Sequence, residues 1–422
     1  VYTGNVTVTR DAGIKLADVP FSVTVWDFEL PKAPSLRSAF HDYDAGYRRG
    51  AVSYYGYVPG GAQHLSLAKA MDEDLLAHRL MPESPFNVGF SIDSTGHIVP
   101  NPEGEAVLES WLARPEVSDY KLYFNTTSPF ADPLGADRAG AINYLRDAYE
   151  WLSSRGFLNK VWLRQVDDPD TPAKFQLARD LADLIHQANP NYNAAVTAQF
   201  YKPGVASYLY GHLNILIMAG WSFDPVASAQ RQAARNQIWS FNALAPGIEN
   251  PSPFWQIDFP LLNFRIFPWI NFRYGLTGLL YWTTAYWEEI QARGASPWTD
   301  PCSYRSGASC FNGDGMLVYP GKEVNYLIPQ NAYGQASSAS VYGPIPSLRL
   351  KALRDGMEDY ELLALAASRD PSRAKQIVIQ VACAGNPDPG NAAANCFHHW
   401  NQDPDGILQA RAQLASIITA PR

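Results

Sequence analysis

The order of apolar and polar positions changes at about residue 33. From there on, short apolar runs alternate with longer stretches in which apolar residues recur every three or four positions. This alternation is typical of βα units in a parallel sheet. The apolar runs predict strands at 36–43, 86–92, 120–125, 161–166, 194–199, 213–219, 238–244 and 279–283. The stretches between them predict helices at 65–80, 104–112, 136–155, 172–188 and 225–236. Eight units over about 250 residues favour an α/β fold of the (β/α)8 TIM-like barrel type over an open doubly wound sheet, whose Gly-x-Gly-x-x-Gly turn is missing.

The first thirty residues follow a different pattern, in which apolar and polar positions alternate singly. Residues 5–9 and 21–26 read as antiparallel strands, with a turn at 11–13. Two or three strands are not stable alone. We therefore expect them either to complete a partial β-sandwich or to pack directly onto the barrel.

Three parts follow from these patterns. Residues 1–32 form the β-strand segment, and 33–365 form the catalytic barrel with a loop-rich stretch at 295–346. Residues 366–422 form a C-terminal helical extension, and helices are expected at 347–367 and 406–418.

Composition narrows the class of partner. The chain has 422 residues, of which 46% are hydrophobic and 18% charged, so it can bury a full core. Its net charge of -8 argues against nucleic acid and against an anionic membrane surface. No run of about 18 apolar residues is present, so we expect no membrane span. The 13% aromatic content suits stacking on sugar rings, which points to an oligosaccharide or polysaccharide substrate.

The four cysteines form two local pairs, Cys302 with Cys310 and Cys383 with Cys396. No His or acidic residue stands beside them at a zinc-like spacing, so we expect two disulfides. Disulfides imply an oxidising compartment. The chain also opens at Val1 without an initiator Met, and together these features predict a secreted or extracytoplasmic protein.

The strongest local signal is the acidic pair Asp167-Asp168 directly after the apolar run 161–166. In a barrel, polar residues at the carboxyl end of a strand lie on the catalytic rim. Two adjacent carboxyl groups do not both ionise easily, so one should keep its proton, which gives the acid and base that glycosidic cleavage needs. An alternative has the same support from spacing: an acidic loop that caps the helix starting at Pro172, a task that Asp170 and Thr171 can also perform.

Other predicted strands also end in polar or aromatic residues, which can bind hydroxyl or amide groups or lie under a sugar ring. The candidate substrate-binding residues are His41, Asp42, Asp93, Asn125, Gln199, Tyr201, Trp221, Tyr281, Trp282 and Trp287. No second His is spaced with His41 as metal ligands are, so we expect no metal, and no motif calls for a cofactor. The Gly-x-Ser-x-Gly elbow of serine hydrolases is also missing.

Three segments of the last third carry a family resemblance. They are Phe264-Arg-Ile-Phe-Pro-Trp-Ile-Asn-Phe-Arg-Tyr-Gly275 with Gly278-Leu-Leu-Tyr-Trp282, Gly313-Asp-Gly-Met-Leu-Val-Tyr-Pro-Gly321, and Ser347-Leu-Arg-Leu-Lys-Ala-Leu-Arg-Asp-Gly-Met-Glu-Asp-Tyr-Glu361. With the lead-in Val25-Trp-Asp-Phe-Glu-Leu-Pro31, they resemble glycoside hydrolase family 123 and the related bacterial domain of unknown function 4091. The resemblance extends from about Phe21 to Leu365.

This resemblance implies a β-sandwich before a (β/α)8 barrel, and a retaining exo-β-N-acetylgalactosaminidase in which the substrate's own 2-acetamido oxygen is the nucleophile. The family carries an Asp-Glu pair after strand four. By position, Asp167 would orient the acetamido group and Asp168 would be the general acid/base, although the second residue is here Asp and not Glu.

The shorter acid keeps two other hypotheses open. A glycosidase of different sugar specificity, for example for a furanoside, would use a direct carboxylate nucleophile, for which Asp42 and Asp93 are candidates. The other hypothesis is a glycan-binding barrel without catalysis.

Overall fold

A seven-stranded parallel sheet forms the centre of the computed structural model, which describes residues 1–40, 54–83, 90–164, 166–200, 202, 204–243, 251–330, 339–384 and 395–421. Its strands are β3 (Arg37–Phe40), β6 (Tyr120–Lys121), β7 (Val161–Arg164), β8 (Ala194–Thr197), β9 (Ile215–Ala219), β10 (Gln237–Asn242) and β11 (Gly278–Tyr281). They lie in the order β3-β11-β10-β9-β8-β7-β6, so the first strand pairs with the last. Seven of the eight predicted strands are therefore confirmed, with shorter bounds.

The sheet is curled around an interior of its own. Alternate residues of its strands form a separate apolar cluster that includes Trp162, Ile217 and Trp239, whereas their neighbours join the larger core beneath the helices. The rings of Trp162 and Trp239 lie 5.0 Å apart although β8 and β9 separate their strands. Side chains of non-adjacent strands meet in this way only when a sheet bends back on itself.

The two edge strands, β3 and β6, are joined by residues 81–83. Phe40 N donates to Met81 O at 2.9 Å, and Glu83 N donates to Phe40 O at 2.9 Å. On the other side, Lys121 N donates to Glu83 O at 3.3 Å. This segment thus occupies the place between the first and third strands, upstream of the predicted strand 86–92. Of that prediction, residues 86–89 lie outside the described part, and the end forms β4 (Ser91–Ile92), which pairs antiparallel with β5 (Ile98–Val99).

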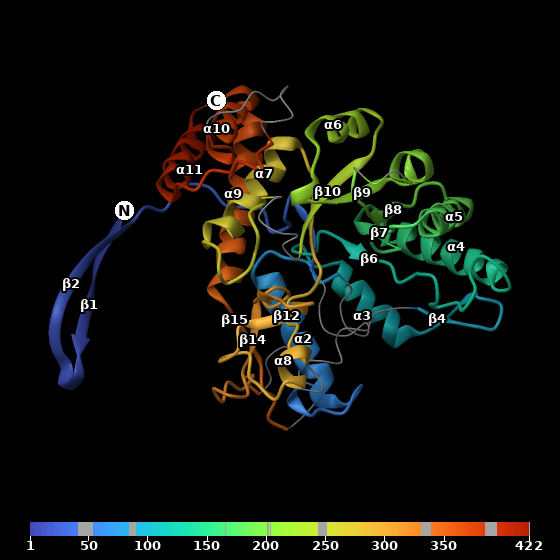
Figure 1. The fold of residues 1–422 in the computed structure, drawn as a ribbon, viewed down its shortest axis with the longest axis horizontal. Coiled ribbons are helices and arrows are strands. Elements are labelled where there is room, and N and C mark those ends of the chain that lie inside the picture. Colours follow the sequence, from blue (N-terminus) through green and yellow to red (C-terminus); the bar gives the residue numbers. More distant parts are fainter. Residues whose placement is uncertain are drawn as a thin grey trace.

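Helices flank the sheet (Figure 1), and all of those between strands except α7 (Leu262–Tyr274) were predicted from the sequence. Those between strands are α2 (Ala62–Ala77), α3 (Pro102–Leu112), α4 (Arg138–Ser154), α5 (Pro172–Ala188), α6 (Pro225–Ala233) and α7 (Leu262–Tyr274). α8 (Glu288–Ala292), α9 (Leu348–Arg369), α10 (Pro371–Ala382) and α11 (Pro404–Thr419) follow β11. Several begin with a capping side chain followed by Pro: Thr171 Oγ1 accepts Lys174 N–H at 3.3 Å before Pro172 of α5, and Asp224 caps α6 in the same way.

The C-terminal helices form a bundle with α7. Asp359 of α9 is fully buried and accepts from Arg265 of α7 at 2.8 Å and from Arg411 of α11 at 2.7 Å. In the part of the chain that is described, no helix is long and apolar enough to cross a membrane.

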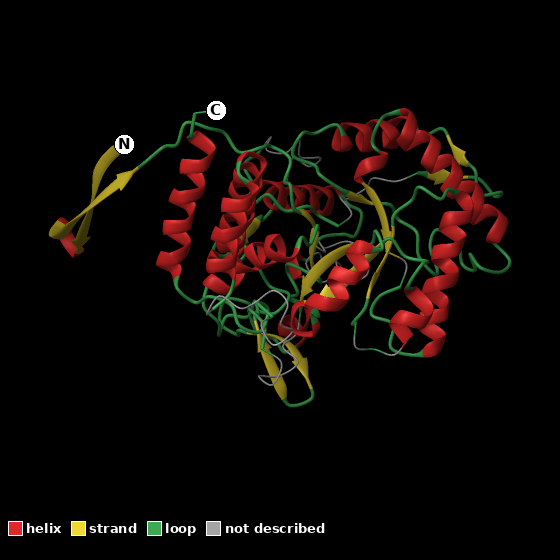
Figure 2. Cartoon of the chain, turned by 90° about the horizontal axis from the view of Figure 1, so that it is seen from above, coloured by secondary structure: helices red, strands yellow, loops and turns green. Residues whose placement is uncertain are grey.

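The N-terminal strands β1 (Tyr2–Arg10) and β2 (Ile14–Val23) form a hairpin that projects away from the rest of the molecule (Figures 1 and 2). All of its described residues except Gly4 are exposed, including Val6, Val19 and Phe21 on one face. The expectation that these strands pack onto the barrel is therefore wrong, and a β-sandwich stays a prediction.

Shorter hairpins follow strand β11. They pair β12 (Cys302–Ser306) with β13 (Ser309–Asn312), and β14 (Val318–Pro320) with β15 (Pro344–Pro346). Both predicted cysteine pairs form disulfides, with Cα–Cα distances of 5.6 Å for Cys302–Cys310 and 4.8 Å for Cys383–Cys396.

Candidate active site

Asp167 and Asp168 follow the carboxyl end of β7, on the rim that the sequence predicts. Their side chains are 74% and 52% exposed, so both carboxylates are open to solvent. Asp168 has a φ of +39°, in the left-handed region that non-glycine residues rarely adopt. Backbone strain of this kind is frequent at functional sites.

Each carboxylate has its own cation. Arg164 Nη1 lies 2.9 Å from Asp167 Oδ1, and Lys202 Nζ lies 2.9 Å from Asp168 Oδ1. The positive charge of Arg164 holds the pKa of Asp167 below its usual range, with help from the Thr197 hydroxyl and from Lys121. Of the two aspartates, Asp167 is therefore the one expected to be ionised, and the division into one acid and one base stays a prediction.

Thr197, at the end of the next strand β8, links the two aspartates. Its hydroxyl donates to Asp167 Oδ1 at 2.5 Å and accepts the backbone N–H of Asp168 at 2.7 Å. Thr197 itself is buried, with 2% of its surface exposed. One side chain thereby fixes both the carboxylate of Asp167 and the strained backbone of Asp168.

Beneath the aspartates lies a row of charges that the sequence interpretation missed. Glu83 Oε1 is 2.9 Å from Arg164 Nη2 and 2.9 Å from Lys121 Nζ. Arg164, Lys121 and Thr197 are polar residues that end otherwise apolar strands. That signal was available in the sequence, but the partnership with Glu83 depends on how residues 81–83 meet the curled sheet.

Three other predicted binding residues make structural contacts within their own turns or strand ends. Asp93 accepts the N–H groups of Thr95 and His97 and so holds the β4–β5 turn, and Asn125 holds a similar turn with Thr127. Gln199 is buried and accepts from the Ser222 hydroxyl. His41, Asp42 and Tyr201 lie outside the described residues.

The predicted aromatic residues divide into buried and accessible ones. Tyr281 and Trp287 have no exposed surface, because Tyr281 packs on Trp255 and the Trp287 indole donates to Val318 O at 3.0 Å. Neither ring can therefore stack on a sugar in this conformation. Trp221 is half-buried, and so is Trp282.

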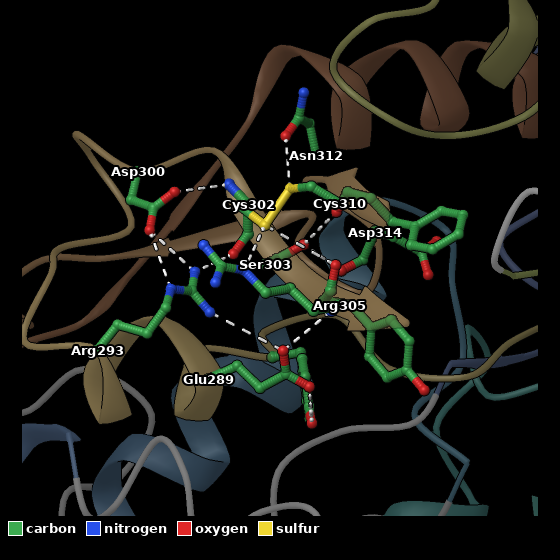
Figure 3. A network of polar contacts seen from close by, with 12 residues as sticks. Glu289, Arg293, Asp300, Cys302, Ser303, Arg305, Cys310, Asn312 and Asp314 are labelled. Carbon is green, nitrogen blue, oxygen red and sulfur yellow. Dashed lines mark hydrogen bonds and ion pairs between the residues drawn. A yellow bond between two sulfur atoms is a disulfide. The ribbon is translucent and has the colours of Figure 1, made fainter. Parts of the chain in front are cut away.

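Trp282 directly follows β11 and contacts the rings of Tyr286 and Tyr304 at 5.0 and 5.7 Å. Tyr304 comes from the β12–β13 hairpin, whose Cys302–Cys310 disulfide lies within a polar network (Figure 3). There Asp300 binds Arg293 at 2.9 Å, as the figure shows.

Asp314 lies under this hairpin and is fully buried. Its Oδ1 accepts the Tyr281 hydroxyl at 3.4 Å, and burial raises its pKa to about 7. Because Asp314 has no exposed surface, we interpret it as a residue that holds Tyr281 at the end of β11 and not as a member of a reacting pair.

The central part of the chain matches a known family. Residues 137–329, which include β7 to β11 and both aspartates, match the family model of the glycoside hydrolase 123 catalytic domain. None of the curated proteins is a recognisable match to the chain.

Among solved structures, the chain is similar to a family 123 glycoside hydrolase from Clostridium perfringens, studied for the details of glycolipid glycan hydrolysis. The TM-score is 0.57 at 13% sequence identity, and the alignment covers 99% of this chain and 74% of that chain. This similarity shows a shared fold. A beta-1,4-D-mannanase from Cryptopygus antarcticus aligns with a TM-score of 0.33 at 12% identity, over 58% of this chain and 84% of that chain.

Proposed function

We propose that this glycoside hydrolase, whose residues 137–329 match the family 123 catalytic domain, is a retaining exo-β-glycosidase that uses the 2-acetamido group of its substrate as nucleophile. In this proposal the substrate is a glycan that ends in a β-linked N-acetylhexosamine, as in a β-N-acetylgalactosaminidase. The scaffold would be a (β/α)8 barrel, with residues 81–83 in the place of its second strand.

The observation that carries the proposal is the position of Asp167 after the carboxyl end of β7, where its carboxylate pairs with Arg164 at 2.9 Å. An acetamido group can attack the anomeric carbon only if its N–H is held and its developing positive charge is balanced, and a carboxylate serves both purposes. Arg164 and Thr197 both bind Oδ1 of Asp167. Within the described residues these contacts leave Oδ2 to accept the acetamido N–H.

Asp168 then has the role of general acid/base. It would protonate the glycosidic oxygen as the bond to the aglycone breaks, and later accept a proton from the water that opens the cyclic intermediate. A substrate oxygen that approaches Asp168 must share or displace its contact with Lys202. The strained backbone at Asp168 aims a carboxyl group that is one methylene shorter than the family's usual Glu.

The direct-nucleophile alternative has less support. It needs a second carboxylate across the site, and one candidate, Asp93, already accepts three hydrogen bonds within its own turn. We therefore favour substrate assistance.

The test is an assay on paired aryl β-glycosides that carry either a 2-acetamido or a 2-hydroxyl group. We expect turnover of the 2-acetamido sugar alone, with rates that fall as the acetyl group is progressively fluorinated, and a β-configured first product by proton NMR. D167N and D168N should each lose activity by at least about 100-fold. Full activity in both variants, or equal turnover of the 2-hydroxyl sugar, would refute the proposal.

A further inference from the structure

Arg164 joins two carboxylates that come from different parts of the barrel wall. It is the last residue of β7, and its side chain is 11% exposed. One terminal nitrogen lies 2.9 Å from Asp167 Oδ1, and the other lies 2.9 Å from Glu83 Oε1. A guanidinium group can bind two carboxylates at once because its nitrogens form a rigid planar fork, whereas an ammonium group is a single point of charge.

Glu83 is well placed to hold this fork. Its side chain is 1% exposed and faces two cations, Arg164 and Lys121. A buried carboxylate is tolerated only when it is paired, so Glu83 and the two cations keep each other in position. The backbone of Glu83 is also fixed, since its N–H and C=O bind the strands on both sides.

The charged and polar groups around Asp167 come from three neighbouring strands. Arg164 belongs to β7 itself, Lys121 to β6, and the Thr197 hydroxyl to β8. Lys202, which follows β8, binds the adjacent Asp168. Of these groups, Arg164 has the largest effect on the pKa of Asp167.

We propose that Arg164 is the positioning residue of Asp167, and that Glu83 fixes Arg164 beneath it. Arg164 keeps one carboxylate oxygen occupied, so that the other faces the substrate, and it keeps the group charged in acidic solution. The inference deepens the proposed function, because it assumes that Asp167 acts as an anion.

The test compares R164Q, R164K and E83Q with the parent on 4-nitrophenyl N-acetyl-β-D-galactosaminide as a function of pH. In R164Q the acidic limb of kcat/KM should move up by about one pH unit or more, because an opposite charge at this distance lowers a carboxyl pKa by about 1–3 units. We expect kcat to fall by at least about 10-fold while KM changes little. R164K should return the acidic limb part of the way to its position in the parent. It should not restore kcat, because lysine can bind only one of the two carboxylates. E83Q should lose rate in the same way.

The matched control is R114Q. Arg114 also makes a two-nitrogen contact with a glutamate, Glu73, at 2.6 and 2.9 Å, but it lies beyond α3 and before β6, away from the carboxyl ends of the strands. This variant should keep the parent's pH profile. The proposal fails if R114Q moves the limb as much as R164Q does, or if R164K has the parent's kcat.

Two readouts separate this inference from the proposed function and from a folding defect. Carbon-13 NMR titration of the Asp167 carboxyl carbon, assigned with D167N, measures the charge of that group without turnover. If D167N is fully active, the proposed function is wrong, whatever the titration shows. If D167N is inactive but the carboxyl of Asp167 titrates alike in the parent and in R164Q, the positioning role is wrong. R164K keeps a buried cation opposite Glu83, so it remains informative even if R164Q does not fold.

Discussion

Replacement of Thr197 by valine tests whether the link between the two aspartates matters for catalysis. Valine has nearly the same shape as threonine, so T197V removes the hydroxyl and little else. Two bonds are lost: the hydroxyl no longer donates to Asp167 Oδ1 at 2.5 Å, and the N–H of Asp168 loses its acceptor at 2.7 Å.

The expected size of the effect follows from the charge of Asp167. A hydrogen bond to a charged group contributes about 1.5–3 kcal/mol. If that energy is expressed in the transition state, kcat/KM should fall by about 10- to 100-fold, since each 1.36 kcal/mol is a factor of ten. The loss should appear mainly in kcat, because the bond aligns a group that acts on the reacting acetamido and does not merely bind the sugar.

Steady-state kinetics on the 2-acetamido aryl glycoside measure this effect, with thermal unfolding to show that the variant is folded. The matched control is T277V, because Thr277 lies before β11 at the opposite end of the strands and its hydroxyl makes a single bond to Gln237 at 3.4 Å. T277V should retain the parent's kcat/KM within about twofold. If a folded T197V retains kcat/KM within about threefold of the parent, the link between the aspartates is not part of the catalytic geometry, and the reasoning is refuted.

Three further predictions concern the acid, the helical bundle and a buried carboxyl. D168E is expected to raise kcat, because one more methylene extends the reach of the proposed acid; a lower kcat would instead show that the site is shaped for aspartate. D359N removes a fully buried charge between two arginines and should destabilise the fold by about 3 kcal/mol or more, seen as a lower Tm, while kcat stays unchanged in the folded enzyme. For Asp314, burial raises the pKa to about 7 from 3.8, so between pH 4 and 7 the folded state holds a proton that the unfolded state has lost. This group therefore makes the parent less stable as pH rises through that window, and D314N should show a weaker loss of stability in chemical unfolding at pH 5 and pH 8; identical pH dependence in the two proteins would contradict the assignment.

Much of the fold could be predicted from periodicity alone. The helix 172–188 was predicted with its observed bounds, because Thr171 and Pro172 mark its start unambiguously. By contrast, α7 was missed because its apolar residues surround the whole helix and Pro268 lies inside it, so no 3.6-residue stripe is visible. The second strand was expected at 86–92, since that run is apolar, whereas the wall is completed by 81–83, whose pairing is set by its neighbours and not by its own composition.

The candidate site was predictable only in part. Adjacent aspartates after an apolar run can be recognised in a sequence, and so can their place at the end of a strand. Their charge states could not be predicted in the same way. Arg164 and Lys202 reach them from positions whose spacing says nothing about contact, and Glu83 is more than 80 residues away from Arg164 along the chain. Likewise, Tyr281 was expected on the rim, but its ring packs on the outer face of the sheet against Trp255.

The segment 81–83 takes part both in the hydrogen bonding of the curled sheet and in the charge network next to Asp167 and Asp168. Glu83 contributes main-chain bonds to both flanking strands, and its carboxylate also holds the two cations below the acidic pair. A one-residue insertion or deletion here would break the main-chain bonds between residues 81–83 and the strands β3 and β6. It would also move the carboxylate of Glu83 away from Arg164 and Lys121. Tolerance to change should therefore be low at this short stretch, even though residues 81–83 form no regular strand of their own.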